Sequence, residues 1–206
     1  MSAAGMSRRP VVFLDRDGTL NEEVGYIREL DNLVLVRGAA AAVRRLNRAG
    51  VAAVLVTNQS GAARGYYPEQ HIQALNERLA HLLEAEGAFL EDVYYCPHLP
   101  EAVVESLSGP CRCRKPLTGL VDRAYAEHKD LDPERAYVVG DKATDVELAR
   151  NCRAKAVLVR TGYGQRVLDG EYQWAVNPDY KAAGIEDAVE WILKDLGLLG
   201  ESSTGA

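Results

Sequence analysis

Acidic side chains follow two of the apolar runs in this sequence. Asp15 and Asp17 come at the end of the first run, and Asp141 and Asp145 follow a later run at 136–140. In an open parallel sheet the residues after each strand meet at the carboxyl edge, where ligands bind. Carboxylates that converge there repel one another unless a cation lies among them, and hard divalent ions prefer oxygen ligands. The pattern therefore predicts a divalent-cation site.

A hydroxyl group and a lysine accompany these acids. Thr57 ends a second apolar run, and Lys115 precedes a helical pattern that leads to the run at 136–140. A lysine and a hydroxyl beside a bound cation form a phosphate site. Each residue also has a simpler interpretation, because an aspartate at a strand end is commonly a turn former or a helix N-cap. For Asp145, direct cation binding, an indirect role beside the cation and a helix cap all remain open.

A second group of residues has metal-ligand spacing. Cys96 and His98 are separated by one residue, and so are Cys111 and Cys113. Three cysteines and one histidine are the ligand set of a closed, tetrahedral structural zinc site. The alternative is that these are ordinary thiols. The loop 96–113 contains three prolines and few large apolar side chains, so it cannot form its own core, and a zinc ion would order it.

Apolar runs alternate with helical patterns along the chain, which is typical of βαβ units. We predict strands at 9–15, 51–57, 93–96, 136–140 and 156–160, with two short strands at 33–36 and 174–176. We predict helices at 39–49, 68–86, 117–128, 145–152 and 185–196. The expected fold is α/β, with one doubly wound domain at 1–196 built on a mainly parallel sheet, and a disordered tail at 197–206.

Composition and charge limit the function classes. The 206 residues include 24 Lys and Arg against 30 Asp and Glu, a net charge of −6, whereas a nucleic-acid-binding domain is expected to be basic. No apolar run approaches the roughly 18 residues of a membrane span, and the run at 11–14 is too short for a signal peptide. We therefore expect a cytoplasmic monomer that acts on a small molecule, without nucleic-acid or membrane partners.

Four motifs together resemble the haloacid-dehalogenase (HAD) superfamily of phosphotransferases: D-R-D-G-T-L at 15–20, T-N at 57–58, Lys115, and G-D-K-A-T-D at 140–145. The resemblance implies a Rossmann-like domain in which Asp15 is the nucleophile and Asp17 the general acid and base. It also implies Mg²⁺ held by Asp15, the backbone carbonyl of Asp17, and Asp141. Thr57 and Lys115 would stabilise the transferring phosphoryl group.

Within this superfamily the chain resembles the group that contains the heptose 1,7-bisphosphate phosphatases and the histidinol-phosphate phosphatase domain. The resemblance rests on V-G-Y at 24–26, V-T-N-Q-S-G-A-A-R-G at 56–65, Y-Y-C-P-H at 94–98 and C-R-C-R-K-P at 111–116. It implies hydrolysis of the C7 phosphate of D-glycero-D-manno-heptose 1,7-bisphosphate, giving heptose 1-phosphate for nucleotide-activated heptose synthesis, a lipopolysaccharide precursor route. The alternatives are a histidinol-phosphate phosphatase and a non-catalytic zinc-binding scaffold.

The resemblance also implies which residues contact the substrate. They are Glu23, Val24, Gly25, Tyr26, Thr57, Asn58, Gln59, Ser60, Arg114 and Lys142. Because a bisphosphate needs more positive charge than a monophosphate, we expect Arg114 and Lys142 to face the second phosphate. The segments after the first motif and before Lys115 have no room for a separate cap, so we expect an open crevice bounded by the zinc loop.

Overall fold

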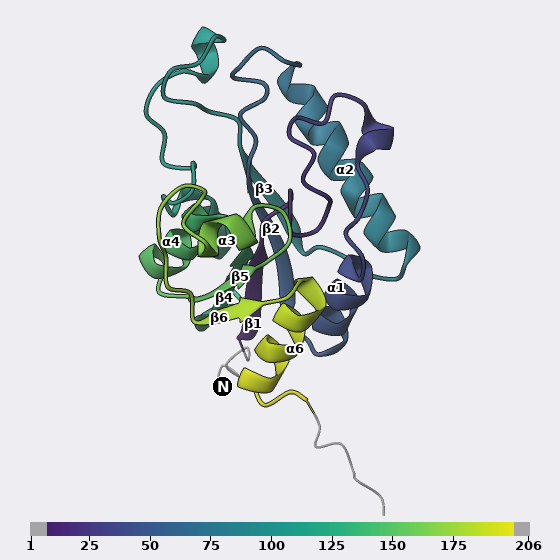
Figure 1. Cartoon of the computed structure of the whole chain (residues 1–206). Coiled ribbons are helices and arrows are strands. Elements are labelled where there is room, and N and C mark those ends of the chain that lie inside the picture. Colours follow the sequence, from purple (N-terminus) through teal and green to yellow (C-terminus); the bar gives the residue numbers. More distant parts are fainter. Residues whose placement is uncertain (1–7, 200–206) are drawn as a thin grey trace, which may run out of the picture.

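The computed structural model describes residues 8–199, which form a six-stranded sheet covered on both faces (Figure 1). The strand order is β3-β2-β1-β4-β5-β6, and every neighbouring pair is parallel. The strands are β1 (Arg9–Leu14), β2 (Ala52–Asn58), β3 (Asp92–Cys96), β4 (Leu131–Gly140), β5 (Lys155–Val159) and β6 (Tyr180–Ala182). The predicted doubly wound α/β architecture is confirmed.

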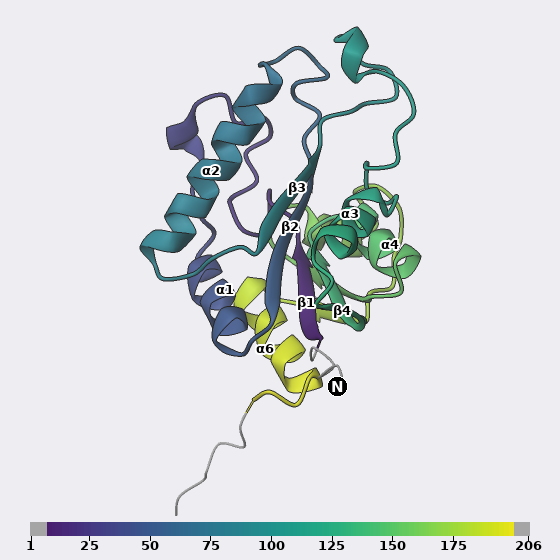
Figure 2. The ribbon, with the colours of Figure 1, turned by 180° about the vertical axis from the view of Figure 1, so that it is seen from behind.

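In the described part of the chain, six α-helices cover the sheet: α1 (Ala39–Arg48), α2 (Glu69–Ala85), α3 (Gly119–Glu127), α4 (Ala143–Asn151), α5 (Gly164–Leu168) and α6 (Ile185–Asp195). Helices α1, α2 and α6 lie on one face, and α3 and α4 on the other (Figure 2). Within residues 8–199, no helix is both long enough and apolar enough to cross a membrane.

Strand β1 shows why this sequence forms a central strand. Val12 and Leu14 pack among the side chains of α1 and α6, whereas Val11 and Phe13 pack against α3 and α4 on the opposite face. All four side chains are fully buried. Because successive side chains of a strand point to opposite faces, a strand covered on both sides needs a continuous apolar run. The acid that follows this run therefore lies at the sheet's carboxyl edge.

The structure differs from the predicted elements in four places, one of which is that β4 begins at Leu131 and not at 136. At 33–36, Leu35 forms only an isolated bridge with Asn21, since the segment packs onto the core beside a short 3-10 helix at Leu30–Asn32. The sixth strand is β6, not 174–176, because β6 hydrogen-bonds to β5 whereas Trp174 is exposed. Helix α5 was not predicted. These short elements depend on their neighbours more than on their own sequence pattern.

The two long insertions at the carboxyl edge carry no cap domain. The segment between β1 and α1 contains only the 3-10 helix Leu30–Asn32, and the segment between β3 and α3 only the 3-10 helix Glu105–Leu107. Both rise beside the carboxyl edge of the sheet (Figure 1). Of the predicted tail at 197–206, residues 200–206 lie outside the described part of the chain.

Candidate active site

Asp15 lies at the carboxyl end of β1, where its backbone N–H donates to the carbonyl oxygen of Val139 on β4. Its carboxylate is buried, and Lys115 Nζ lies 2.8 Å from its Oδ1 atom. Burial alone would raise the pKa of Asp15, but the ammonium groups of Lys115 and Lys142 hold it below its ordinary value. Asp15 is therefore ionised at neutral pH, as a carboxylate nucleophile must be.

Three side-chain donors hold the Asp17 carboxylate. Arg16 Nη2 lies 3.1 Å from Oδ1, Asn21 Nδ2 donates to the same oxygen at 3.0 Å, and Gln59 Nε2 donates to Oδ2 at 2.8 Å. Arg16 is itself buried: Nη1 donates to Asn76 Oδ1, and Nη2 also donates to Gln59 Oε1. The carboxylate of Asp17 is thus oriented from two separate loops and still lines the cavity.

Asp141 follows β4 and lies between two glycines. Gly18 has a φ of +82°, and a Cβ atom there would lie 2.3 Å from Oδ2 of Asp141. Gly162 packs on the same oxygen, to which the backbone N–H of Tyr163 donates at 2.8 Å. The glycine of the D-R-D-G-T-L motif is therefore required both for its left-handed backbone and for the close approach of Asp141 to β1.

Asp145 contributes in two ways that its position in the sequence left open. Its Oδ2 accepts a hydrogen bond from the backbone N–H of Lys142 at 3.0 Å, at the first turn of α4. Its Oδ1 lies 2.6 Å from Lys115 Nζ. Burial would lower the pKa of Lys115, but Asp145 and Asp15 raise it. Asp145 therefore both caps the helix and keeps Lys115 charged beside Asp15.

The acidic cluster fits a divalent cation. Oxygens of Asp15, Asp141 and Asp145 lie within 4.8 Å of one another. Burial raises the pKa of Asp141 to about 7, and the charges of Asp15 and Asp145 add to this against the opposing effect of Lys142. Buried carboxylates this close need a positive charge among them. The donor set consists of oxygens, which suits Mg²⁺.

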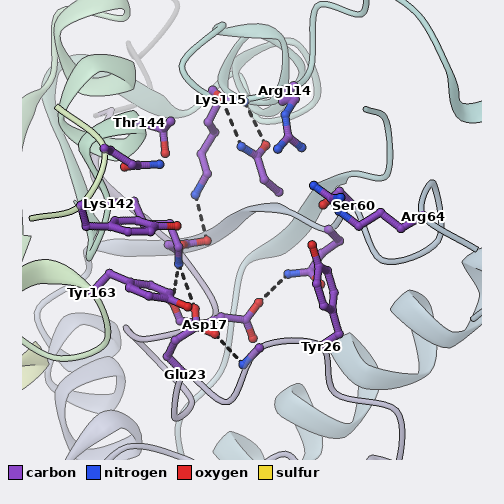
Figure 3. Close-up of a pocket in the computed structure, with 16 residues that line it drawn as sticks. Asp17, Glu23, Tyr26, Ser60, Arg64, Arg114, Lys115, Lys142, Thr144 and Tyr163 are labelled. Atoms are coloured by element: carbon purple, nitrogen blue, oxygen red, sulfur yellow. Dashed lines mark hydrogen bonds and ion pairs between the residues drawn. The ribbon is translucent and has the colours of Figure 1, made fainter. Parts of the chain in front are cut away.

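The ammonium group of Lys142 lies among the oxygens that are expected to bind Mg²⁺. Its Nζ lies 2.9 Å from Asp141 Oδ1, 3.3 Å from the carbonyl oxygen of Asp17 and 3.8 Å from Asp15 Oδ2. These three residues are the ones expected to hold Mg²⁺. Lys142 also lies 3.1 Å from Glu23 (Figure 3). A cationic group is therefore stably held among the expected ligands.

Asp15, Asp17, Lys115 and Lys142 line a cavity of about 310 Å³ at the carboxyl edge of the sheet, and Asp141 and Asp145 are buried beneath its lining. Of the residues expected to act on phosphate or substrate, the lining includes Asp15, Asp17, Glu23, Gly25, Tyr26, Asn58, Gln59, Ser60, Arg114, Lys115 and Lys142. Val24 is 56% exposed and does not line the cavity. Thr57 is buried, and Gln59 donates to its hydroxyl at 2.9 Å. The structure thus brings most of the predicted set together.

Asn58 and Arg114 shape this cavity through backbone groups. The Asn58 side chain accepts from the backbone N–H of Lys115 at 2.9 Å and donates to its carbonyl oxygen at 3.1 Å. Arg114 Nη1 donates to the carbonyl oxygen of His98 at 3.1 Å. The position of Lys115 is therefore set by β2 and by the loop before it.

The cavity also contains residues that the sequence analysis missed: Arg64, Thr144, Tyr163, Tyr172 and Gln173. Tyr163 and Tyr172 stack with ring centroids 4.2 Å apart. A signal for Tyr163 was present, because it follows β5, the next strand of the sheet, and residues after each parallel strand gather at the same edge. Arg64 belongs to the G-A-A-R-G motif at 61–65.

The predicted zinc ligands also converge. The Sγ atom of Cys96 lies 3.0 Å from that of Cys113 and 3.7 Å from that of Cys111, and His98 Nδ1 lies 3.3 Å from Cys113 Sγ. A tetrahedral zinc ion with bonds of about 2.3 Å to sulfur separates its ligands by roughly 3.7 Å. The four ligand atoms lie within 4.8 Å of one another, close enough to hold one metal ion, directly before Arg114 and Lys115.

Comparisons with known proteins agree with this geometry. The family model described as HAD-hyrolase-like matches residues 112–188. A D-glycero-D-manno-heptose-1,7-bisphosphate 7-phosphatase of Thermosynechococcus vestitus is 54% identical over 91% of this chain and 97% of its own length. The chain belongs to this phosphatase family.

Two further relatives of this family support the assignment. The D-glycero-beta-D-manno-heptose-1,7-bisphosphate 7-phosphatase of Escherichia coli K12 is 37% identical over 94% of this chain and 93% of its own. The crystal structure of the D,D-heptose 1,7-bisphosphate phosphatase of B. bronchiseptica, complexed with magnesium and phosphate, has a TM-score of 0.79 and 27% identity, over 90% of this chain and 99% of that one. The resemblance inferred from the motifs is confirmed, and the protein is a phosphatase of the HAD superfamily.

Proposed function

We propose that this protein hydrolyses the C7 phosphate of D-glycero-D-manno-heptose 1,7-bisphosphate, with Mg²⁺ as cofactor. The observation that carries the proposal is the ionised Asp15 carboxylate beside Lys115, with Asp17 lining the same cavity. The names of the relatives supply the substrate. The product is heptose 1-phosphate.

The first step is attack of an Asp15 oxygen on phosphorus. The bond between phosphorus and the C7 oxygen breaks, Asp17 gives a proton to this oxygen, and an aspartyl phosphate remains on Asp15. In the second step Asp17 takes a proton from water, the water oxygen attacks phosphorus, and the bond to Asp15 breaks to release inorganic phosphate. Asp17 is suited to both steps because Arg16, Asn21 and Gln59 hold its carboxylate at the cavity wall.

Positive charge around Asp15 lowers the electrostatic barrier to an approaching phosphate. Lys115 Nζ lies 2.8 Å from Asp15 and 2.6 Å from Asp145. The side chain of Asn58 also holds the backbone of Lys115 through two hydrogen bonds. Mg²⁺, held by Asp15, Asp141 and the carbonyl oxygen of Asp17, would neutralise the phosphoryl oxygens as charge develops. Lys142 would remain paired with Glu23, which lies 3.1 Å from its Nζ atom.

A zinc ion bound by Cys96, His98, Cys111 and Cys113 would have a structural role. These residues form a closed site with no position for a substrate, and the loop they hold ends at Arg114 and Lys115. Zinc would therefore act by holding one wall of the cavity.

The experiment that tests the function is phosphate release measured on four substrates side by side. These are the α and β anomers of heptose 1,7-bisphosphate, histidinol phosphate and an aryl phosphate. We expect the highest kcat/KM with one anomer of the bisphosphate. A higher kcat/KM with histidinol phosphate would assign the protein to that reaction instead, and no turnover of any substrate would leave a non-catalytic scaffold.

A further inference from the structure

Four cationic side chains line the cavity, and they differ in how their charge is balanced. Lys115 is paired with Asp15 and Asp145, and Lys142 with Asp141 and Glu23. Within residues 8–199, neither Arg64 nor Arg114 has a carboxylate within ion-pair distance. The only side-chain hydrogen bond of Arg114 in this region goes to the neutral carbonyl oxygen of His98. Two guanidinium groups therefore remain free to bind an anion.

The two arginines occupy the same side of the cavity. Figure 3 shows Arg64 extending past Ser60 toward the cavity, with Arg114 on the same wall, opposite Lys142 and Tyr163. Asp15 and Lys115, where the reacting phosphoryl group must bind, line the same cavity. A bound bisphosphate must place its second phosphate away from Asp15. Arg64 and Arg114 provide positive charge that is not balanced by a carboxylate among the described residues, so the second phosphate can bind beside them.

The backbone that carries Arg64 is well anchored although its side chain is exposed. The N–H of Arg64 donates to the carbonyl oxygen of Ser60 at 3.0 Å. The carbonyl oxygen of Ala63 accepts from Val103 at 2.9 Å and Val104 at 3.1 Å, both in the loop 96–113. The same loop leads to Arg114. One loop therefore supports both arginines.

The guanidinium of Arg64 is also oriented by an aromatic ring. It lies 5.9 Å from the ring centroid of Tyr26, and Tyr26 in turn packs edge-on against Tyr66 at 4.7 Å. Contact with a ring face restrains a cationic side chain without using its hydrogen-bond donors. The planar guanidinium remains able to bind a phosphate through two parallel hydrogen bonds.

We propose that Arg64 determines substrate specificity by binding, together with Arg114, the phosphate that is not hydrolysed. This inference rests on the proposed function, since it requires a substrate with two phosphates. It assigns to Arg64 the role that Lys142 was expected to share with Arg114, because Lys142 is already surrounded by acidic groups.

The test compares three substrates: heptose 1,7-bisphosphate, the same heptose carrying only the 7-phosphate, and an aryl phosphate. In Arg64→Met, kcat/KM for the bisphosphate should fall about 10- to 150-fold, as expected for a lost charge-assisted contact. The loss should appear mainly in KM, and turnover of both monophosphates should change less than about twofold. Arg64→Lys should recover part of the loss.

Arg28→Met is the matched control. Arg28 lies 5.4 Å from the ring centroid of Tyr66, in the same aromatic cluster, but outside the cavity lining. This variant should leave all three substrates unaffected. Equal losses on all substrates in Arg64→Met, or an unchanged preference for the bisphosphate, would overturn the role of Arg64. If the unmodified protein itself does not prefer the bisphosphate, the proposed function fails instead.

Discussion

The side-chain amide of Gln59 donates a hydrogen bond to the Asp17 carboxylate at 2.8 Å and, from the same nitrogen, one to the Thr57 hydroxyl at 2.9 Å. The loop after β2 is thereby joined to the turn after β1. Gln59 was expected to contact the substrate, and it does line the cavity, but its amide is already used to hold the proposed general acid and base.

Gln59→Met should therefore reduce kcat by about tenfold, a fraction of the 10²- to 10⁴-fold that general acid–base catalysis contributes. KM should change little, because the side chain acts through Asp17. Steady-state kinetics would measure the effect. Gln73→Met is the control, since Gln73 donates to Tyr95 outside the cavity. A raised KM with unchanged kcat would assign Gln59 to substrate binding.

Asp15→Asn should abolish turnover and the trapping of a phosphoenzyme, because an amide oxygen is a poor nucleophile. Asp17→Asn should retain Mg²⁺ binding through its backbone carbonyl but lose about 10²- to 10⁴-fold in kcat. Quenched-flow trapping of labelled phosphate on the protein would separate the two roles. Full activity in either variant would refute the corresponding assignment.

Metal analysis of the purified protein should find about one zinc ion per chain that survives dialysis against conditions that remove Mg²⁺. Cys113→Ser should lose this zinc and lower activity, because the loop carries Arg114 and Lys115. Cys152→Ser is the control, since Cys152 lies outside the cluster. Normal zinc content in Cys113→Ser, or normal activity without zinc, would contradict the structural role.

Lys142→Met should increase the affinity for Mg²⁺ by roughly tenfold, because it removes a positive charge from the oxygens that are expected to bind the ion. The Mg²⁺ concentration that gives the half-maximal rise in melting temperature would report this affinity without substrate. Lys181→Met, which changes an exposed lysine on β6, serves as the control. Weaker Mg²⁺ binding in Lys142→Met would show that the lysine supports the site instead.

The affinity for Mg²⁺ should also depend on pH. Burial raises the pKa of Asp141 to about 7 in the metal-free protein, and Mg²⁺ must displace the proton. The apparent affinity should therefore be constant above pH 7 and fall as the pH decreases below it, by up to about tenfold per pH unit. Titrations followed by melting temperature between pH 5.5 and 8.5 would show this. A flat profile would mean that Asp141 is ionised throughout.

The sequence by itself determined the sheet and the residues at its carboxyl edge. A run such as Val11–Leu14 is typical of a strand buried on both faces, and the acids after such a strand lie at that edge. The sequence also predicted that Cys96, His98, Cys111 and Cys113 lie together, and the structure brings these four side chains into one cluster. A short stretch of sequence predicts an element correctly when its own residues determine which of its faces are buried.

Only the tertiary structure decided how the side chains share these positions. That Asp145 caps α4 and pairs with Lys115, and that Lys142 lies among the acids, depends on segments far apart in the chain. Arg64 is identified as a free cation only once the partners of the other lysines and arginines are known. Charge balance is a property of the assembled cavity, because folding decides which ammonium and guanidinium groups lie beside a carboxylate and which do not.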